Sequence, residues 1–161
     1  MERELERYLA DRGPTGLFTR LARATLLVEG FQHRCLDPFG LRFIDFSVLR
    51  VLDLAGEPHE LSAGELAELT LRSTGGITQI VDRLVGAGLV VRRPDPVDRR
   101  RVVIGLTATG LDVVRRAQQA YARERARVLA PLDDAELARL DEAVARLIDV
   151  LEGDAAVEVA S

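Results

Sequence analysis

Five arginines are concentrated in a short stretch whose charge differs from that of the remaining chain. Between Leu89 and Arg101 five arginines and two aspartates give a local balance of +3, whereas the whole chain carries −4. The five are Arg92, Arg93, Arg99, Arg100 and Arg101. A guanidinium can hold a phosphate or a guanine through two parallel hydrogen bonds, so this cluster could bind a nucleic acid. Every basic residue of the chain is arginine, which could equally reflect the base composition of the genome.

The arginines surround a loop that two prolines stiffen. Apolar residues on either side predict strands at 89–93 and 101–104, with Pro94 and Pro96 restricting the turn between them. A stiff basic hairpin could reach the minor groove of DNA, where the potential is most negative. Asp98 would repel phosphate, and its spacing suggests that it orients Arg100 instead. A solvated, charge-rich turn is the alternative interpretation.

Directly before this hairpin, polar residues occupy one face of a predicted helix from Ser73 to about Val85. The opposite, apolar face holds Ile77, Val81, Leu84 and Val85. Hydroxyl and amide side chains near a helix N-terminus suit the major groove: Gln79 could pair with adenine, and Thr78 could contact a base edge. The candidate DNA-binding residues of this helix are Ser73, Thr74, Thr78, Gln79 and Arg83. A solvated surface is the alternative, and the neighbouring arginine hairpin favours DNA.

Capping signals predict where the surrounding helices begin. Ser62 with Glu65, and Asp133 with Glu136, have the spacing of capping boxes, and Thr107 can cap a third helix. Apolar periodicity predicts further helices at 17–35 and 43–54. From Leu137 to Leu151 a heptad-like apolar seam requires a partner helix.

These elements predict a mostly α-helical fold with a small β-hairpin wing: a winged helix-turn-helix flanked by N- and C-terminal helices. We expect an N-terminal arm and first flanking helix at 1–40, and a DNA-binding lobe at 41–106. The C-terminal helices, whose apolar seam requires a partner, should cover 107–152, and a flexible tail 153–161.

Four motifs resemble the MarR family of transcriptional regulators. Asp98-Arg99-Arg100 followed by Leu106-Thr107 is similar to the wing signature of that family, D-x-R-x5-L-T. The segments 61–67, 78–84 and 88–90 also fit, so that the close resemblance covers about residues 61–110. Gln79 departs from the family pattern, because many relatives have arginine or lysine there.

The resemblance implies a homodimer that binds duplex DNA at a pseudo-palindromic operator. It also implies that the flanking helices, within 1–40 and 107–152, are the N- and C-terminal dimerisation helices. By matching position, Thr78 and Gln79 would read bases, Arg83 would contact the backbone, and Arg99 or Arg100 would enter the minor groove. Repression that a ligand relieves is the family default. A winged-helix module that binds protein rather than DNA is an alternative.

Aromatic residues cluster where relatives of this family often bind small aromatic or phenolic acids. The candidate effector-binding residues are Phe31, His33, Phe39, Arg42, Phe43 and Phe46. An apolar pocket with one or two polar anchors suits such a ligand. Ordinary core packing is the alternative. A redox sensor based on Cys35 is a further alternative, although Cys35 lies on an apolar stripe, which favours burial and low reactivity.

Other classes of protein are disfavoured by what the sequence lacks. No apolar run approaches the roughly 20 residues of a membrane span, and the charged N-terminus lacks a signal peptide, so we expect a cytoplasmic protein. One cysteine and two histidines cannot assemble the usual zinc sites, and no cofactor is expected. Neither a G-x-S-x-G elbow nor a glycine-rich phosphate loop is present, so we expect no enzymatic activity.

Overall fold

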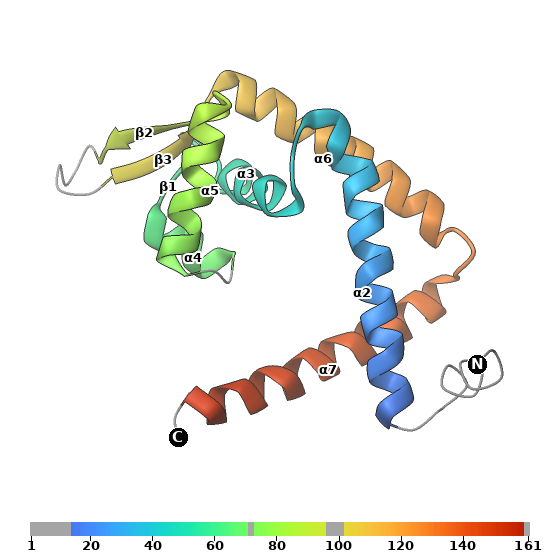
Figure 1. Ribbon diagram of the computed structural model, residues 1–161. Coiled ribbons are helices and arrows are strands. Elements are labelled where there is room, and N and C mark those ends of the chain that lie inside the picture. The colour runs from blue at the N-terminus through green and yellow to red at the C-terminus, as the bar shows by residue number, and fades with distance from the viewer. Residues whose placement is uncertain (1–13, 71–72, 96–101, 160–161) are drawn as a thin grey trace, which may run out of the picture. The chain divides into compact units, whose positions relative to one another are not determined.

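Helices form most of the chain, and a small sheet is inserted among them (Figure 1). The computed structural model describes residues 14–70, 73–95 and 102–159. The helices are α2 (Pro14–Leu36), the 3-10 helix η1 (Asp37–Phe39), α3 (Phe43–Leu54), α4 (Ala63–Leu69), α5 (Thr74–Gly86), α6 (Ala108–Leu129) and α7 (Asp134–Val159). The strands are β1 (Glu60–Ser62), β2 (Val90–Pro94) and β3 (Val102–Leu106). The predicted mostly helical class is confirmed.

The chain divides after Ala122 into two compact units, the second of which contains α7. The division shows which residues pack together but not what each unit does. The residue ranges expected for dimerisation and for DNA binding therefore stay predictions. No helix within the described ranges is long and apolar enough to cross a membrane.

The predicted helix starts are confirmed, and local hydrogen bonds explain them. At the start of α4 the Ser62 hydroxyl accepts from the Glu65 N–H at 3.2 Å, and the Glu65 carboxylate accepts from the Ser62 N–H at 2.8 Å. Asp133 and Glu136 make the same reciprocal pair before α7. Thr107 caps α6 through its hydroxyl. Each cap satisfies N–H groups that the first helical turn leaves without a partner.

The sheet contains one strand more than the sequence predicted. Its order is β1-β3-β2, and both pairings are antiparallel. The hairpin of β2 and β3, which we call the wing, was expected, but β1 was not. A strand of three residues is too short to show an alternating pattern. It forms because β3 offers an edge on which Leu61 lies opposite Ile104.

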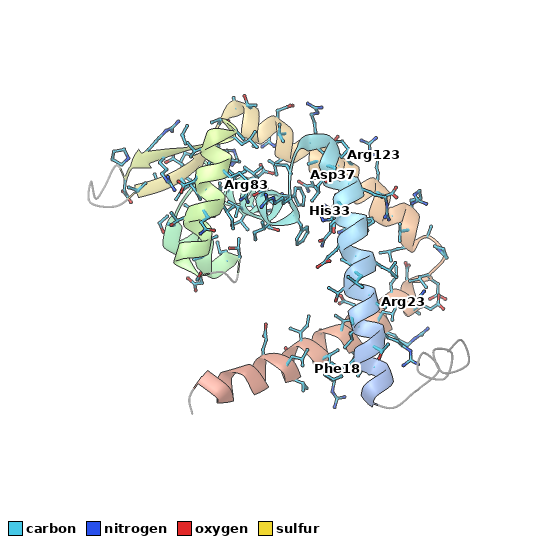
Figure 2. All side chains as sticks on the ribbon, in the orientation of Figure 1. Phe18, Arg23, His33, Asp37, Arg83 and Arg123 are labelled. Carbon is cyan, nitrogen blue, oxygen red and sulfur yellow. The ribbon has the colours of Figure 1, made fainter. Side chains whose placement is uncertain are left out.

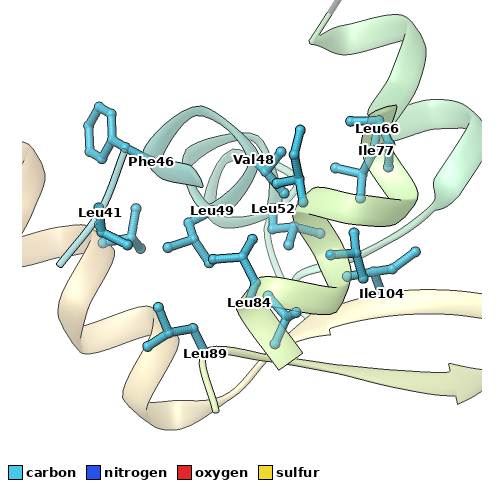
Figure 3. Packing of buried hydrophobic residues seen from close by; sticks show 14 of the residues in the cluster. Leu41, Phe46, Val48, Leu49, Leu52, Leu66, Ile77, Leu84, Leu89 and Ile104 are labelled. Carbon is cyan, nitrogen blue, oxygen red and sulfur yellow. The ribbon is translucent and has the colours of Figure 1, made fainter. Parts of the chain in front are cut away.

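The core of the first unit is built around α3 (Figure 3). Val48, Leu49 and Leu52 on this helix are completely buried. Residues from the helix-turn-helix and the wing surround them, namely Leu66, Ile77, Leu84, Leu89 and Ile104. Helix α3 therefore supports α4 and α5 as well as the sheet.

The predicted apolar face of α5 needs one correction. Ile77, Val81 and Leu84 are buried as expected, but Val85 is 40% exposed. Ile80, which was not predicted, is 7% exposed and joins the core. At about 100° per residue, Ile77 and Leu84 lie between Ile80 and Val81 on the helical wheel. The buried face is therefore centred on these residues, and Val85 falls at its edge.

Two helices carry large apolar side chains that the single chain leaves exposed. In α2 these are Leu17, Phe18, Leu26, Leu27 and Val28. In α7 the predicted seam contributes Leu140, Val144, Ile148 and Leu151, which are 43–53% exposed. Exposed apolar side chains in this number are unfavourable in water.

Candidate nucleic-acid interface

Helix α5 is held at both ends by local sequence features. The Ser73 hydroxyl accepts from the Gly76 N–H at 3.2 Å. At the other end Gly88 adopts a φ of 70°, a left-handed conformation that favours glycine. The N–H groups of Gly88 and Leu89 then bond back to the carbonyls of Val85 and Leu84. This pair of bonds is a Schellman motif, which ends the helix and starts the chain toward β2.

The polar face of α5 is exposed, as the sequence predicted. Ser73, Thr78 and Gln79 are all exposed. Thr78 and Gln79 lie opposite Ile77 and Ile80, which pack into the core. The backbone of Thr74 begins the helix, but its side chain lies outside the described residues. Thr78 and Gln79 could therefore reach base edges without any change in the packing of the lobe.

Arg83 has an ion-pair partner that the sequence did not reveal (Figure 2). Its Nε lies 3.1 Å from Oδ1 of Asp45, and its Nη2 makes a second, shorter bond to the same carboxylate. The Asp45 side chain is 3% exposed and that of Arg83 is 35% exposed. The guanidinium thus ties α5 to α3, and contact of Arg83 with the DNA backbone stays a prediction.

Asp45 also fixes the beginning of α3. Its Oδ2 accepts a hydrogen bond from the Arg42 N–H at 3.0 Å, which satisfies one N–H of the first helical turn. The same carboxylate therefore caps one helix and anchors another. No sequence signal at Asp45 distinguishes this double role from that of any acidic residue in a first turn.

The arginines at the base of the wing also contact acidic residues. Arg92 Nη1 lies 2.5 Å from Asp82 Oδ1 on α5, and Arg93 Nη1 lies 2.8 Å from Glu60 Oε1 on β1. The other predicted wing residues, Asp98, Arg99 and Arg100, lie outside the described residues.

The root of the wing is locked to the end of α5 by the threonine of the D-x-R-x5-L-T motif. The Thr107 hydroxyl donates to the Gly88 carbonyl at 2.8 Å and accepts from the Gly110 N–H at 2.9 Å. A Cβ at Gly110 would lie only 1.9 Å from the backbone oxygen of Leu89. Only glycine permits this close approach of α6 to the chain that enters β2.

Three of the predicted effector-binding residues gather around Tyr121 of α6. The ring of Phe31 meets Tyr121 edge-on at 5.1 Å, that of Phe46 stacks on it at 5.7 Å, and that of Phe43 lies 6.5 Å away. We call Phe31, Phe43, Phe46 and Tyr121 the aromatic cluster. Sequence reasoning missed Tyr121, although it continues the buried stripe of Gly110, Val114 and Ala117. The spacing of four, three and four could have indicated it.

The other predicted effector residues lie apart from the aromatic cluster. The Phe39 ring lies beneath the Arg116 guanidinium at 5.8 Å. His33 is exposed beside Asp37 at the end of α2, with 3.5 Å between Nδ1 and Oδ1 (Figure 2). Arg42 is exposed at the start of α3. Cys35 is 6% exposed, and this burial disfavours reaction with an oxidant.

Helix α5 has an exposed polar face, lies next to the wing and packs on the core around α3. This arrangement defines a winged helix-turn-helix DNA-binding lobe, in which α5 is the recognition helix. Comparison with known proteins agrees: residues 39–101 match the model of the MarR family. The chain is 32% identical over 136 residues to a putative transcriptional regulatory protein for the hcr operon of Thauera aromatica, covering 84% of this chain and 74% of that protein. The chain belongs to the MarR family of winged-helix transcriptional regulators.

Two further comparisons describe how far the similarity extends. The chain is 43% identical over 88 residues to YcgE of Bacillus subtilis, an uncharacterised HTH-type transcriptional regulator, covering 55% of this chain and 53% of YcgE. It therefore spans about half the length of that relative. Among solved structures, AbsC of Streptomyces coelicolor, a MarR-family regulator, superposes with a TM-score of 0.76 at 27% identity, covering 91% of this chain and 98% of AbsC.

The family membership decides several of the sequence-based expectations. MarR-family regulators bind DNA and act as dimers, and the homologues are transcriptional regulators rather than enzymes. The expected fold, family and regulatory class are thus confirmed. The roles of single residues are tested by none of these findings and stay predictions.

Proposed function

We propose that this protein is a dimeric repressor that binds a pseudo-palindromic operator, and that a small aromatic or phenolic effector lowers its affinity for this operator. The observation that carries the proposal is the exposed face of Ser73, Thr78 and Gln79 on α5, next to the arginine-rich wing. Two such lobes related by a two-fold axis would meet successive major grooves about one helical turn apart.

The apolar surfaces of α2 and α7 support the dimer. Leu26 and Leu27 on α2 are 69% and 63% exposed, and the α7 seam is also open. Pairing with a second copy would remove this surface from water, and burial of apolar area is the main favourable term in association.

Selection of bound duplexes from a random pool tests DNA binding, half-site symmetry and spacing together. We expect an enriched inverted repeat with half-sites about 10 base pairs apart, centre to centre. Enrichment of no sequence, even at low salt, would contradict the proposal and would favour a winged-helix module that binds protein.

Substitutions then test the residue roles. Gln79→Ala should weaken binding of the selected operator by about 1–3 kcal/mol and relax preference at one base position. Gln119→Ala is a matched control, since Gln119 is an exposed glutamine on α6, outside the helix-turn-helix. Arg100→Ala should weaken binding to all sequences and reduce the slope of log affinity against log salt concentration by about one. Unchanged affinity in both variants would contradict these roles.

The aromatic cluster supports an aromatic effector. Phe43 is 44% exposed although it belongs to the cluster, so a ligand ring could cover it and gain contact with three other rings. The organohalide-sensing regulator RdhR has been crystallised with 2,4-dichlorophenol; it is 21% identical to this chain and shares the fold with a TM-score of 0.74.

A panel of hydroxybenzoates tests the effector. We expect compounds that bind to raise the melting temperature of the free protein and to weaken operator binding, because a ligand shifts an equilibrium only by its differential affinity for the two states. Cyclohexanecarboxylate is the control, since it has similar size and charge but no aromatic ring. Absence of both effects across the panel would contradict an aromatic effector and leave the DNA-binding proposal intact.

A further inference from the structure

The sheet brings an acidic residue of β1 across its central strand to an arginine of the wing. Glu60 lies opposite Gly105 on β3, and Gly105 lies opposite Val91 on β2. Residues directly opposite one another share a face of the sheet, as does Arg93, which is two residues beyond Val91. The Glu60 side chain therefore has to cross β3 to bond Arg93 at 2.8 Å.

Gly105 makes this crossing possible. A Cβ at position 105 would lie 2.8 Å from Cγ and 3.0 Å from Oε1 of Glu60. Real Cβ atoms do not tolerate the shorter distance, so a side chain at this position would push Glu60 away. The Glu60 side chain is only 15% exposed, which shows how closely it lies against the strand.

Arg92 makes a second pair on the opposite face of the same strand. Successive residues of a strand point to opposite faces, and Arg92 accordingly faces α5. Its guanidinium lies 2.5 Å from Asp82 Oδ1 and also donates to the Thr78 carbonyl at 3.5 Å. Thr78 and Asp82 are one helical turn apart, so Arg92 spans a turn of the recognition helix.

We propose that Asp82 and Glu60 are positioning residues: Asp82 fixes the wing against α5 by holding Arg92, and Glu60 fixes the wing against β1 by holding Arg93. This inference rests on the proposed DNA binding by α5 and the wing. Two adjacent arginines at the base of the hairpin are held on opposite faces, so the hairpin resists bending in either direction. Arg92 and Arg93 thus contact acidic side chains of this same chain.

For these acidic residues, the positioning role and simple electrostatics predict opposite changes in DNA affinity. Phosphate repels carboxylates, so simple electrostatics predicts that removing Glu60 or Asp82 tightens DNA binding. If these residues position the wing, their removal instead weakens binding. The direction of the change therefore separates the two accounts without any need for a precise magnitude.

The test measures operator affinity and its salt dependence for four variants of the full chain. We expect Glu60→Ala, Asp82→Ala and Gly105→Ala each to weaken binding about two- to fivefold, the factor that corresponds to a partly exposed ion pair. Gly105→Ala retains every charge, so electrostatics alone predicts no change for it. Glu60→Gln retains an oxygen that can accept from Arg93 and should stay close to the wild type.

The control and the melting temperature complete the design. Glu68→Ala removes an exposed carboxylate from α4 and should bind as tightly as the wild type, or more tightly. Melting temperatures identify any variant that fails to fold, and such a variant is left out of the comparison. The operator affinity of folded Glu60→Ala then decides whether the inference holds. Tighter or unchanged binding by folded Glu60→Ala overturns the inference. Failure of the wild type to bind any duplex would instead overturn the proposed function.

Discussion

The ion pair between Asp45 and Arg83 offers a direct test of how the recognition helix is held. We consider Asp45→Asn, Arg83→Gln and the double variant, because each substitution removes a charge and keeps a polar side chain. The two partners differ in exposure, with 3% of the Asp45 side chain and 35% of the Arg83 side chain accessible to water. This asymmetry predicts unequal costs.

The magnitudes follow from which charge is left behind. Removing one partner of a buried pair costs about 3–5 kcal/mol when the remaining charge is buried, and Arg83→Gln leaves Asp45 in that state. We therefore expect a loss of about 3 kcal/mol for Arg83→Gln. Asp45→Asn leaves a guanidinium that water can reach, so its expected cost is lower, about 1–2 kcal/mol. The double variant should cost less than the sum of the two.

Chemical denaturation at fixed protein concentration measures these differences, since the stability of a dimer depends on its concentration. Thermal unfolding should show the same order, with about 2–4 °C lost for each kcal/mol in a chain of this size. A larger loss for Asp45→Asn than for Arg83→Gln, or full additivity in the double variant, would refute the reasoning. The salt slope of operator binding gives a second readout. If Arg83 contacts phosphate instead, Arg83→Gln should reduce this slope by about one.

Three further predictions concern the supports of the interface. Gly110→Ala should destabilise the protein by several kcal/mol, because its Cβ would lie 1.9 Å from the Leu89 carbonyl oxygen and α6 would have to move; an unchanged melting temperature would contradict this. Ser62→Ala should cost about 1 kcal/mol in denaturant titrations by removing the cap of α4, whereas a neutral effect would mean that the capping box contributes little. Ile148→Glu places a charge on the exposed seam of α7 and should shift the protein from dimer to monomer in sedimentation or light-scattering experiments; a stable dimer at micromolar concentration would exclude that seam from the interface.

Long-range contacts explain what sequence reasoning missed. Asp45 and Arg83 are 38 residues apart, and Glu60 and Arg93 are 33 residues apart. The sequence could not predict either pair, because the chain has many acidic residues and many arginines, and nothing near each residue indicates its partner. The stripe of α6 could have indicated that Tyr121 is partly buried, but it could not indicate which rings Tyr121 would meet.

Local sequence was sufficient for the helix starts and for the hairpin of β2 and β3. The capping boxes at Ser62 and Asp133, the Ser73 cap and the turn at Gly88 act over three to five residues, so the chain specifies these helix ends before it folds. Apolar periodicity likewise predicted the inner face of α5, apart from the exchange of Val85 for Ile80. The family signature added the order of these elements and the expected role of the wing.

The sequence by itself determined where helices begin, which face of α5 is polar and that a basic hairpin follows it, because caps, periodicity and turns are short-range effects. Tertiary structure alone decided that β1 joins the sheet and that Arg83 pairs with a buried carboxylate. It also decided that Arg92 and Arg93 pair with acidic residues of the same chain. These features depend on distances between residues far apart in the chain, which only the packing of α3, α5 and the sheet around one core defines.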